Sequence, residues 1–113
     1  MKSGPYPSLF DVATTCDVVA GTIVLYENTW VHHIVAKHPE LEPYLQQIQS
    51  SVETPTYVAQ SKPGPSGKHS GNLVFVNDDV KIRTSSLHVY VESQVNSNLV
   101  GTAFFGKQNH GIV

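Results

Sequence analysis

The chain has 113 residues, of which 40% are hydrophobic and 14% are charged, and its formal net charge is −2. This length and composition predict one globular domain, residues 1–113. The chain is too short for two independent cores. The slight negative charge argues against the strong nonspecific nucleic-acid affinity of basic proteins, although six histidines can become positive beside phosphate. The single cysteine, Cys16, excludes an internal disulfide, so we expect a protein of the reducing cytoplasm.

The N-terminal part is expected to be an extended lead-in, residues 1–16, because glycine and prolines interrupt it. No apolar stretch is long enough for a signal peptide or a membrane span, so no membrane partner is expected. The following run DVVAGTIVLY is rich in β-branched residues. It predicts a strand centred on residues 22–25, with Gly21 at its start or in a bulge.

The stretch TWVHHIVAKHPEL, residues 29–41, predicts a helix capped by Asn28 or Thr29 that ends at His38. Pro39 stops this helix and is suited to the first turn of a second one, which is expected to run to about residue 52. The second helix has an apolar stripe and is interpreted as core support. The stripe comprises Leu41, Tyr44 or Leu45, Ile48 and Val52.

The histidines of this stretch do not share one helix face. At about 100° per residue, Trp30 and Ile34 define the apolar face, His33 flanks it by about 60°, and His32 points to solvent. His33 and His38 lie about 140° apart, and no glutamate separates histidines at i and i+4. This geometry disfavours a zinc site, so neither a metal nor a cofactor is expected.

From residue 56 onward the pattern changes to strands, in the segments TYVAQ, NLVFV, VKIRT, LHVYVES and LVGTAFFG. A tight turn is expected at residues 77–79 and another at residues 93–98. Alternation places His88, Tyr90 and Glu92 on one polar sheet face. A helical N-terminal half followed by an antiparallel C-terminal meander predicts an α+β domain.

The segment SKPGPSGKHSG, residues 61–71, is the most basic part of the chain. It is too long for a tight turn and lies between two predicted strands, a position where functional loops are common. A solvated linker remains the alternative interpretation.

Several catalytic classes find no support in the sequence. Cys16 has no glycine elbow or helix start beside it, and no phosphate-binding glycine loop or serine hydrolase elbow is present. Histidine with basic and hydroxyl partners remains, which is suited to metal-free cleavage of RNA. That reaction needs a base for the ribose 2′-OH, an acid for the departing 5′-oxygen, and donors for the phosphate oxygens.

His33 is the candidate for the proton-transfer group. Arg83, Lys68 or Lys81 can stabilise the phosphate, and Thr102 can hold it through its hydroxyl. For each of these residues a structural role is the alternative: a packed histidine on a helix, a solvated arginine or an ordinary strand threonine. Trp30 is interpreted as a core anchor.

The pattern W-x-x-H-I at residues 30–34, followed by H-P-E-L at residues 38–41 and a terminal G-T-A-F strand, resembles a known family. It is similar to the phage-associated branch of the barnase/EndoU/colicin/RelE-like (BECR) nucleases. The resemblance covers about residues 22–106. It implies N-terminal helices packed on a curved antiparallel sheet, with a metal-independent ribonuclease site between them.

In this resemblance His33 matches the helix histidine and Thr102 the hydroxyl of the last strand, with Arg83 as a third catalytic candidate. His38, Ser61 and Lys68 are the corresponding candidates for substrate binding. The implied partners are RNA, with tRNA among the candidates, and an antitoxin or immunity protein. The sequence therefore predicts a toxin or a phage or mobile-element effector, and the alternatives are an inactive binding module of the same fold and a zinc hydrolase.

Overall fold

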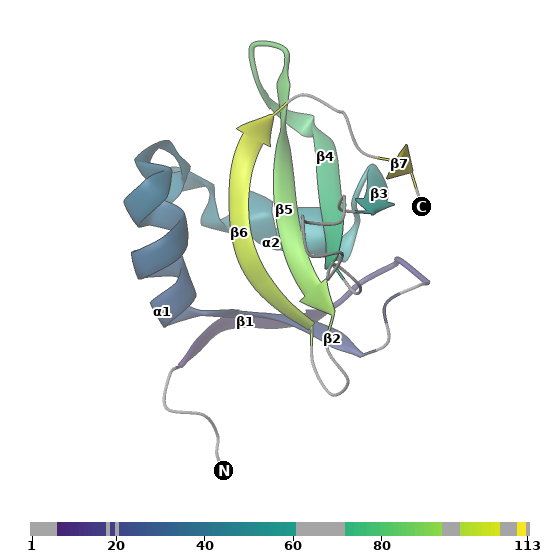
Figure 1. The fold of residues 1–113 in the computed structure, drawn as a ribbon, viewed down its shortest axis with the longest axis horizontal. Coiled ribbons are helices and arrows are strands. Elements are labelled where there is room, and N and C mark those ends of the chain that lie inside the picture. The colour runs from purple at the N-terminus through teal and green to yellow at the C-terminus, as the bar shows by residue number, and fades with distance from the viewer. Residues whose placement is uncertain are drawn as a thin grey trace, which may run out of the picture.

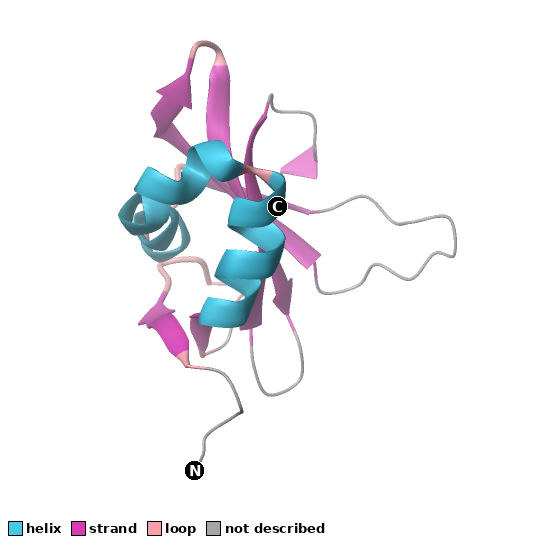
Figure 2. Ribbon diagram, turned by 90° about the vertical axis from the view of Figure 1, so that its left-hand side faces the viewer, coloured by secondary structure: helices cyan, strands magenta, loops and turns pink. Residues whose placement is uncertain are grey.

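The computed structural model describes residues 7–17, 19, 21–60, 72–93, 98–106 and 111–112. Its strands form one seven-stranded sheet in the order β1-β2-β6-β5-β4-β3-β7, with helices on one side of it (Figures 1 and 2). The predicted α+β class is confirmed. The strands are β1 Ser8–Ala13, β2 Thr22–Tyr26, β3 Tyr57–Gln60, β4 Asn72–Ile82, β5 Ser85–Ser93, β6 Asn98–Gly106 and β7 Gly111–Ile112.

The predicted lead-in contains a strand that the sequence interpretation missed. β1 pairs antiparallel with β2 and buries Phe10 in the core. The alternation of Phe10 and Val12 along this strand places both side chains toward the core cluster. The prolines that interrupt the N-terminal region precede the strand, so they do not prevent its pairing.

The first helix begins two or three residues earlier than predicted, directly at the end of β2. It comprises α1 Glu27–Thr29 and the π-helical segment η1 Trp30–Val35. Tyr26 occupies the N-cap position and forms no side-chain capping bond, so Asn28 and Thr29 are not the cap. The helix follows β2 without an intervening loop, so it begins without the side-chain cap that was expected.

Pro39 separates the first helix from the second, as predicted. His38 has a nonhelical φ of −134°, and the chain continues as the 3₁₀ helix η2 Pro39–Tyr44 and then as α2 Leu45–Glu53. The apolar stripe of this unit is buried: Leu41, Ile48 and Val52 have no exposed surface. The prediction that the second helix supports the core is therefore confirmed.

The core lies between the helices and one sheet face. α2 contacts β1, β4 and β5, and the first helix lies beside β6 (Figures 1 and 2). The buried side chains of β5 and β6 on this face include Leu87, Val89, Val91, Val100 and Ala103. Burial of such aliphatic side chains, which contributes about 1.5–3 kcal/mol for each, is the main source of stability.

The sheet is mixed rather than purely antiparallel. β3, β4, β5 and β6 form the predicted antiparallel meander, but β2 pairs with β6 in parallel. The start of β2 matches the prediction, because Gly21 has a left-handed φ of 83° immediately before Thr22. The side-chain amide of Asn98 also donates to the Thr22 carbonyl at 2.9 Å, which fixes β6 beside β2.

The turn predicted at residues 77–79 is instead a bulge within the long strand β4. The Asn77 side chain accepts a bond from the Asp79 N–H at 2.9 Å, a local bond typical of turns. The chain nevertheless resumes pairing with β5 at Lys81, and the hairpin turns at residues 83–84. The turn predicted at residues 93–98 falls mostly outside the described residues.

The sheet face opposite the helices is less polar than predicted. His88 is fully buried there, and its Nδ1 lies 2.9 Å from the Ser86 carbonyl oxygen. Tyr90 is half-buried and packs against Val74, Val76 and Ala59, whereas Glu92 is exposed. Of the three predicted polar side chains, Glu92 is therefore the one that faces solvent.

Within the described ranges, no helix is long and apolar enough to cross a membrane.

Candidate functional site

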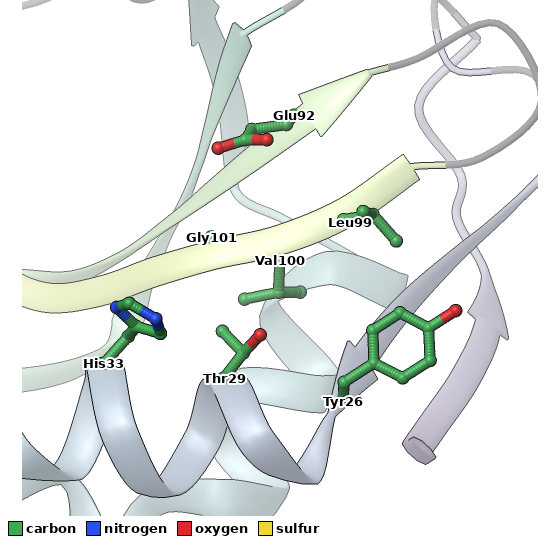
Figure 3. A pocket seen from close by; sticks show the side chains of 7 residues that line it. All are labelled: Tyr26, Thr29, His33, Glu92, Leu99, Val100 and Gly101. Carbon is green, nitrogen blue, oxygen red and sulfur yellow. The ribbon is translucent and has the colours of Figure 1, made fainter. Parts of the chain in front are cut away.

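An open pocket of about 250 Å³ lies where the first helix meets the bulged part of β6 (Figure 3). It includes His33 from the helix and Glu92 from β5. Side chains of both types can donate a proton to a bound ligand or accept one from it. Thr29 adds a hydroxyl group at the same wall. The full set of lining residues is Tyr26, Thr29, His33, Glu92, Leu99, Val100 and Gly101.

The helix wall of the pocket follows from the way β2 runs into the first helix. Tyr26 ends β2, and Thr29 and His33 lie four residues apart on the helix that follows, so they share one side of it. Ile34, which follows His33, is fully buried in the core. This burial anchors the helix turn and directs the His33 imidazole toward β6 (Figure 3).

The π-helical hydrogen bonding of η1 includes His33. Such segments are rare in proteins and are frequent at functional sites. The helical wheel used for prediction assumes regular α-helical spacing, yet its main result is retained. His32 is exposed and does not belong to the pocket lining, whereas His33 belongs to it.

The sheet wall is shaped by a bulge in β6. Tyr90 pairs with Thr102 and Val91 with Val100, so Gly101 is the extra residue of β6. The Glu92 carboxylate lies over Gly101: a Cβ at this glycine would be 3.2 Å from Glu92 Oε2. The absence of a side chain at Gly101 therefore leaves the space that Glu92 occupies beside the pocket.

His33 and Glu92 reach the pocket from opposite sides of β6. Figure 3 shows the imidazole rising from the helix and the carboxylate on β5, with Gly101 between them. One side chain can donate a proton while the other accepts one, and both are open to solvent. This arrangement is chemically suited to acid–base catalysis on a small group bound over Gly101.

Thr102, the predicted hydroxyl group, directly follows the pocket residue Gly101. It is half-buried and lies opposite Tyr90 in the sheet. It is not itself among the pocket-lining residues, so the structure does not bring this predicted hydroxyl group into the pocket.

Arg83, the third predicted catalytic residue, is not brought to this pocket. It lies in the hairpin turn between β4 and β5, where it is exposed and has a left-handed φ of 58°. From Ser85 to Glu92 the strand β5 extends about 23 Å, at about 3.3 Å per residue. Lys81, also exposed, lies at the same distant end.

His38, predicted to bind substrate, lies past the C-terminal end of the first helix. Its Nδ1 is 3.6 Å from the Glu40 carboxylate, and its ring centroid is 6.3 Å from that of Phe104. Phe104 is three residues beyond Gly101 on β6, or about 10 Å along the strand. His38 therefore lies beside the pocket along β6 and does not line it.

Ser61 and Lys68, the other predicted substrate-binding residues, lie outside the described residues. The strand positions that flank their segment are described, however: Gln60 ends β3 and Asn72 begins β4. Asn72 is the register partner of Glu92. The segment predicted to be a functional loop therefore joins the sheet next to the carboxylate of the pocket.

Glu92 is predicted from the sequence to lie on the polar sheet face, but no motif in the sequence assigns it a role in a site. The available signal was the glutamate at the end of LHVYVES, facing a strand that contains glycine at residue 101. Thr29 was interpreted only as a helix cap, yet it lines the pocket. In the described part of the chain, no group of three or more potential metal ligands is found.

Comparisons of the chain with models of known protein families, with curated proteins and with solved structures found no match.

Proposed function

We propose that this protein is a metal-independent endoribonuclease in which Glu92 and His33 form the acid–base pair. The observation that carries this proposal is their presence in one open pocket, on either side of Gly101. Histidine exchanges protons readily near neutral pH, and a carboxylate is an effective general base. The resemblance of residues 30–41 to a nuclease family supports the same reaction class.

The reaction needs one proton acceptor and one proton donor. In the proposed mechanism the Glu92 carboxylate takes the proton of the ribose 2′-OH, and the 2′-oxygen forms a bond to phosphorus. The bond from phosphorus to the 5′-oxygen breaks, and protonated His33 gives its proton to that oxygen. The products are a 2′,3′-cyclic phosphate and a 5′-hydroxyl end, so no external oxidant or metal is needed.

Hydroxyl groups are the proposed donors to the phosphate oxygens. Thr29 lies in the pocket wall, and Thr102 directly follows the pocket residue Gly101 along β6. Each such donor stabilises the charge that develops on the phosphate in the transition state. Lys68 and Ser61 remain candidates for phosphate contacts, because their segment joins the sheet at the register partner of Glu92.

Cleavage of RNA in excess chelator tests this proposal. We expect the wild-type protein to cleave, and His33→Ala and Glu92→Gln each to lower the rate by roughly 10²–10⁴-fold, the usual contribution of a general acid or base. His32→Ala is the matched control, since His32 is an exposed neighbour outside the pocket lining. Full activity in either pocket variant, with the fold intact, would remove the proposal.

An inactive binding module of the same fold is the second candidate. The pocket-lining residues of the described structure include no lysine or arginine, and the chain has a net charge of −2. A site that only binds RNA or a protein would retain its ligand in chelator without cleaving RNA. This outcome in the wild-type protein would favour the second candidate.

The proposed biological role is a toxin or a phage or mobile-element effector that acts on RNA in the cytoplasm, with tRNA among the candidate substrates. Such an enzyme is expected to arrest growth on expression unless an immunity protein is present. The His33→Ala variant should express without growth arrest, which links toxicity to the pocket rather than to the fold.

A further inference from the structure

Aromatic rings gather along β6 beyond the pocket, two of them on the sheet face opposite the helices and one from His38. Phe104 lies 5.5 Å from Tyr90 and 6.3 Å from His38, measured between ring centroids, and all three side chains are half-buried. Phe104 and the pocket residue Gly101 belong to the same strand, about 10 Å apart. We call His38, Tyr90 and Phe104 the ring cluster.

The Phe104 ring is held in place by contacts with neighbouring residues of β5 and β6. Its ring stacks on the fully buried His88, with centroids 5.3 Å apart and planes 23° from parallel. It also covers Gly106, where a Cβ would approach the Phe104 ring to 2.7 Å. A ring held in this way loses little conformational freedom when a ligand packs against it.

The pocket is small for a whole nucleotide. A volume of about 250 Å³ is below the roughly 300–1,000 Å³ of pockets that enclose a drug-sized ligand. The ribose and phosphate can occupy the pocket beside His33 and Glu92, and the attached base must then extend along the neighbouring surface. In one direction along β6, the ring cluster lies about 10 Å from Gly101.

The charged groups at the ring cluster and the pocket do not favour phosphate neutralisation. The ring cluster and the pocket-lining residues contain no lysine or arginine, and the Glu40 carboxylate lies 3.6 Å from His38. Phosphate neutralisation, the usual source of nucleic-acid affinity, is therefore weak at these residues. Stacking of bases on aromatic side chains supplies affinity without cationic groups.

We propose that the ring cluster is a base-stacking subsite for single-stranded RNA, adjacent to the pocket that holds the reacting phosphate. This inference rests on the proposed ribonuclease function and names the form of its substrate. The bases of a duplex are paired and stacked on one another, so they cannot reach the rings. The enzyme is therefore specific for unpaired segments, such as loops and single-stranded ends.

Binding of a noncleavable ligand tests the subsite separately from catalysis. The probe is a short single-stranded oligoribonucleotide with 2′-O-methyl groups, which lacks the nucleophile, and its affinity is measured by fluorescence anisotropy. Phe104→Leu should weaken binding by at least about fivefold, the lower end expected for loss of one stacked base. Phe104→Tyr, which keeps the ring, should bind like the wild type. The loss of binding affinity in Phe104→Leu, expressed as a ratio to the wild type, should be the same at high salt.

Phe105→Leu is the matched control. Phe105 is the next residue of β6 and packs edge-on against Tyr44 at 5.3 Å, beside the core rather than in the ring cluster. This variant should bind the probe like the wild type. If Phe104→Leu does not fold, Tyr90→Leu takes its place, with the same expected loss of affinity.

The outcomes separate the two proposals. Binding that depends on Phe104, in a protein that cleaves no RNA, supports the subsite and contradicts the ribonuclease. Cleavage of RNA together with unchanged probe binding by Phe104→Leu overturns the subsite and leaves the ribonuclease in place. Absence of probe binding by the wild type, or equal binding of a duplex of the same sequence, also overturns the subsite.

Discussion

The Glu92 carboxylate lies against Gly101, where a Cβ would be 3.2 Å from Glu92 Oε2, and both residues line the pocket. The two residues are neighbours because β6 has one more residue than β5 at this point. A bulge of this kind changes the direction in which side chains point and is common next to active sites. The identity of single residues, here a glycine facing a glutamate, thus determines where the Glu92 carboxylate lies, and with it the position of the proposed acid–base pair.

The Tyr57 side chain is predicted to make the stability of the fold depend on pH in the alkaline range. Burial raises the pKa of its hydroxyl, and the negative charge of Asp78 raises this pKa further. Because the folded-state pKa is above the ordinary value of about 10, the neutral form is favoured by folding. The resulting stability is present below about pH 10 and is lost as the pH rises through the folded-state pKa.

Denaturant unfolding measured from neutral to alkaline pH checks this expectation. The wild-type protein should lose more stability above about pH 10 than Tyr57→Phe, which has no proton to release. The comparison of the two proteins removes the contribution of the other titrating groups. Equal alkaline loss in both proteins would contradict the assigned cause.

At the scale of elements, the sequence predicted those parts that depend on local patterns. The helix break at Pro39, the apolar stripe of α2 and the strands β2, β5 and β6 all follow from periodicity or from backbone restrictions. The bulge in β4 could not be predicted in this way. The hydrogen bond of the Asn77 side chain is compatible with a tight turn and with a bulge. The structure is a bulge because the chain pairs with β5 again from Lys81 onward.

The actual hairpin turn had no sequence signal, because Arg83 occupies a position that usually takes glycine. Ile82 pairs with Ser85, so Arg83 and Thr84 form a two-residue turn, and Arg83 has a φ of 58°. Two-residue hairpins favour glycine or asparagine where φ is positive. The nonlocal pairing of β4 with β5 imposes this conformation on an arginine.

Arg83→Gly should therefore stabilise the protein by up to about 1 kcal/mol, because it relieves the left-handed conformation. RNA cleavage should remain unchanged, since the turn lies far from the pocket along β5. Thr84→Gly is the control: Thr84 does not have a positive φ, so this change should only destabilise. Thermal and denaturant unfolding measure the first effect, and a loss of stability in Arg83→Gly would contradict the strain.

At the scale of the whole molecule, the site depends on contacts that are remote in sequence. The helix that contains His33 precedes the strand that contains Glu92 by about half of the chain, and the parallel pairing of β2 with β6 brings the two together. Composition and periodicity predicted the α+β class and selected His33. They could not select its partner, because strand order and the β6 bulge arise only from the complete sheet.

The measurement that tests the central claim most directly is the RNA cleavage rate of the double variant His33→Ala/Glu92→Gln, compared with both single variants in excess chelator. Residues that act as one catalytic unit have strongly nonadditive effects. We therefore expect the double variant to be about as slow as the slower single variant. Cleavage rates in which the two losses multiply, or a wild-type protein that leaves RNA intact, would contradict the proposed acid–base pair.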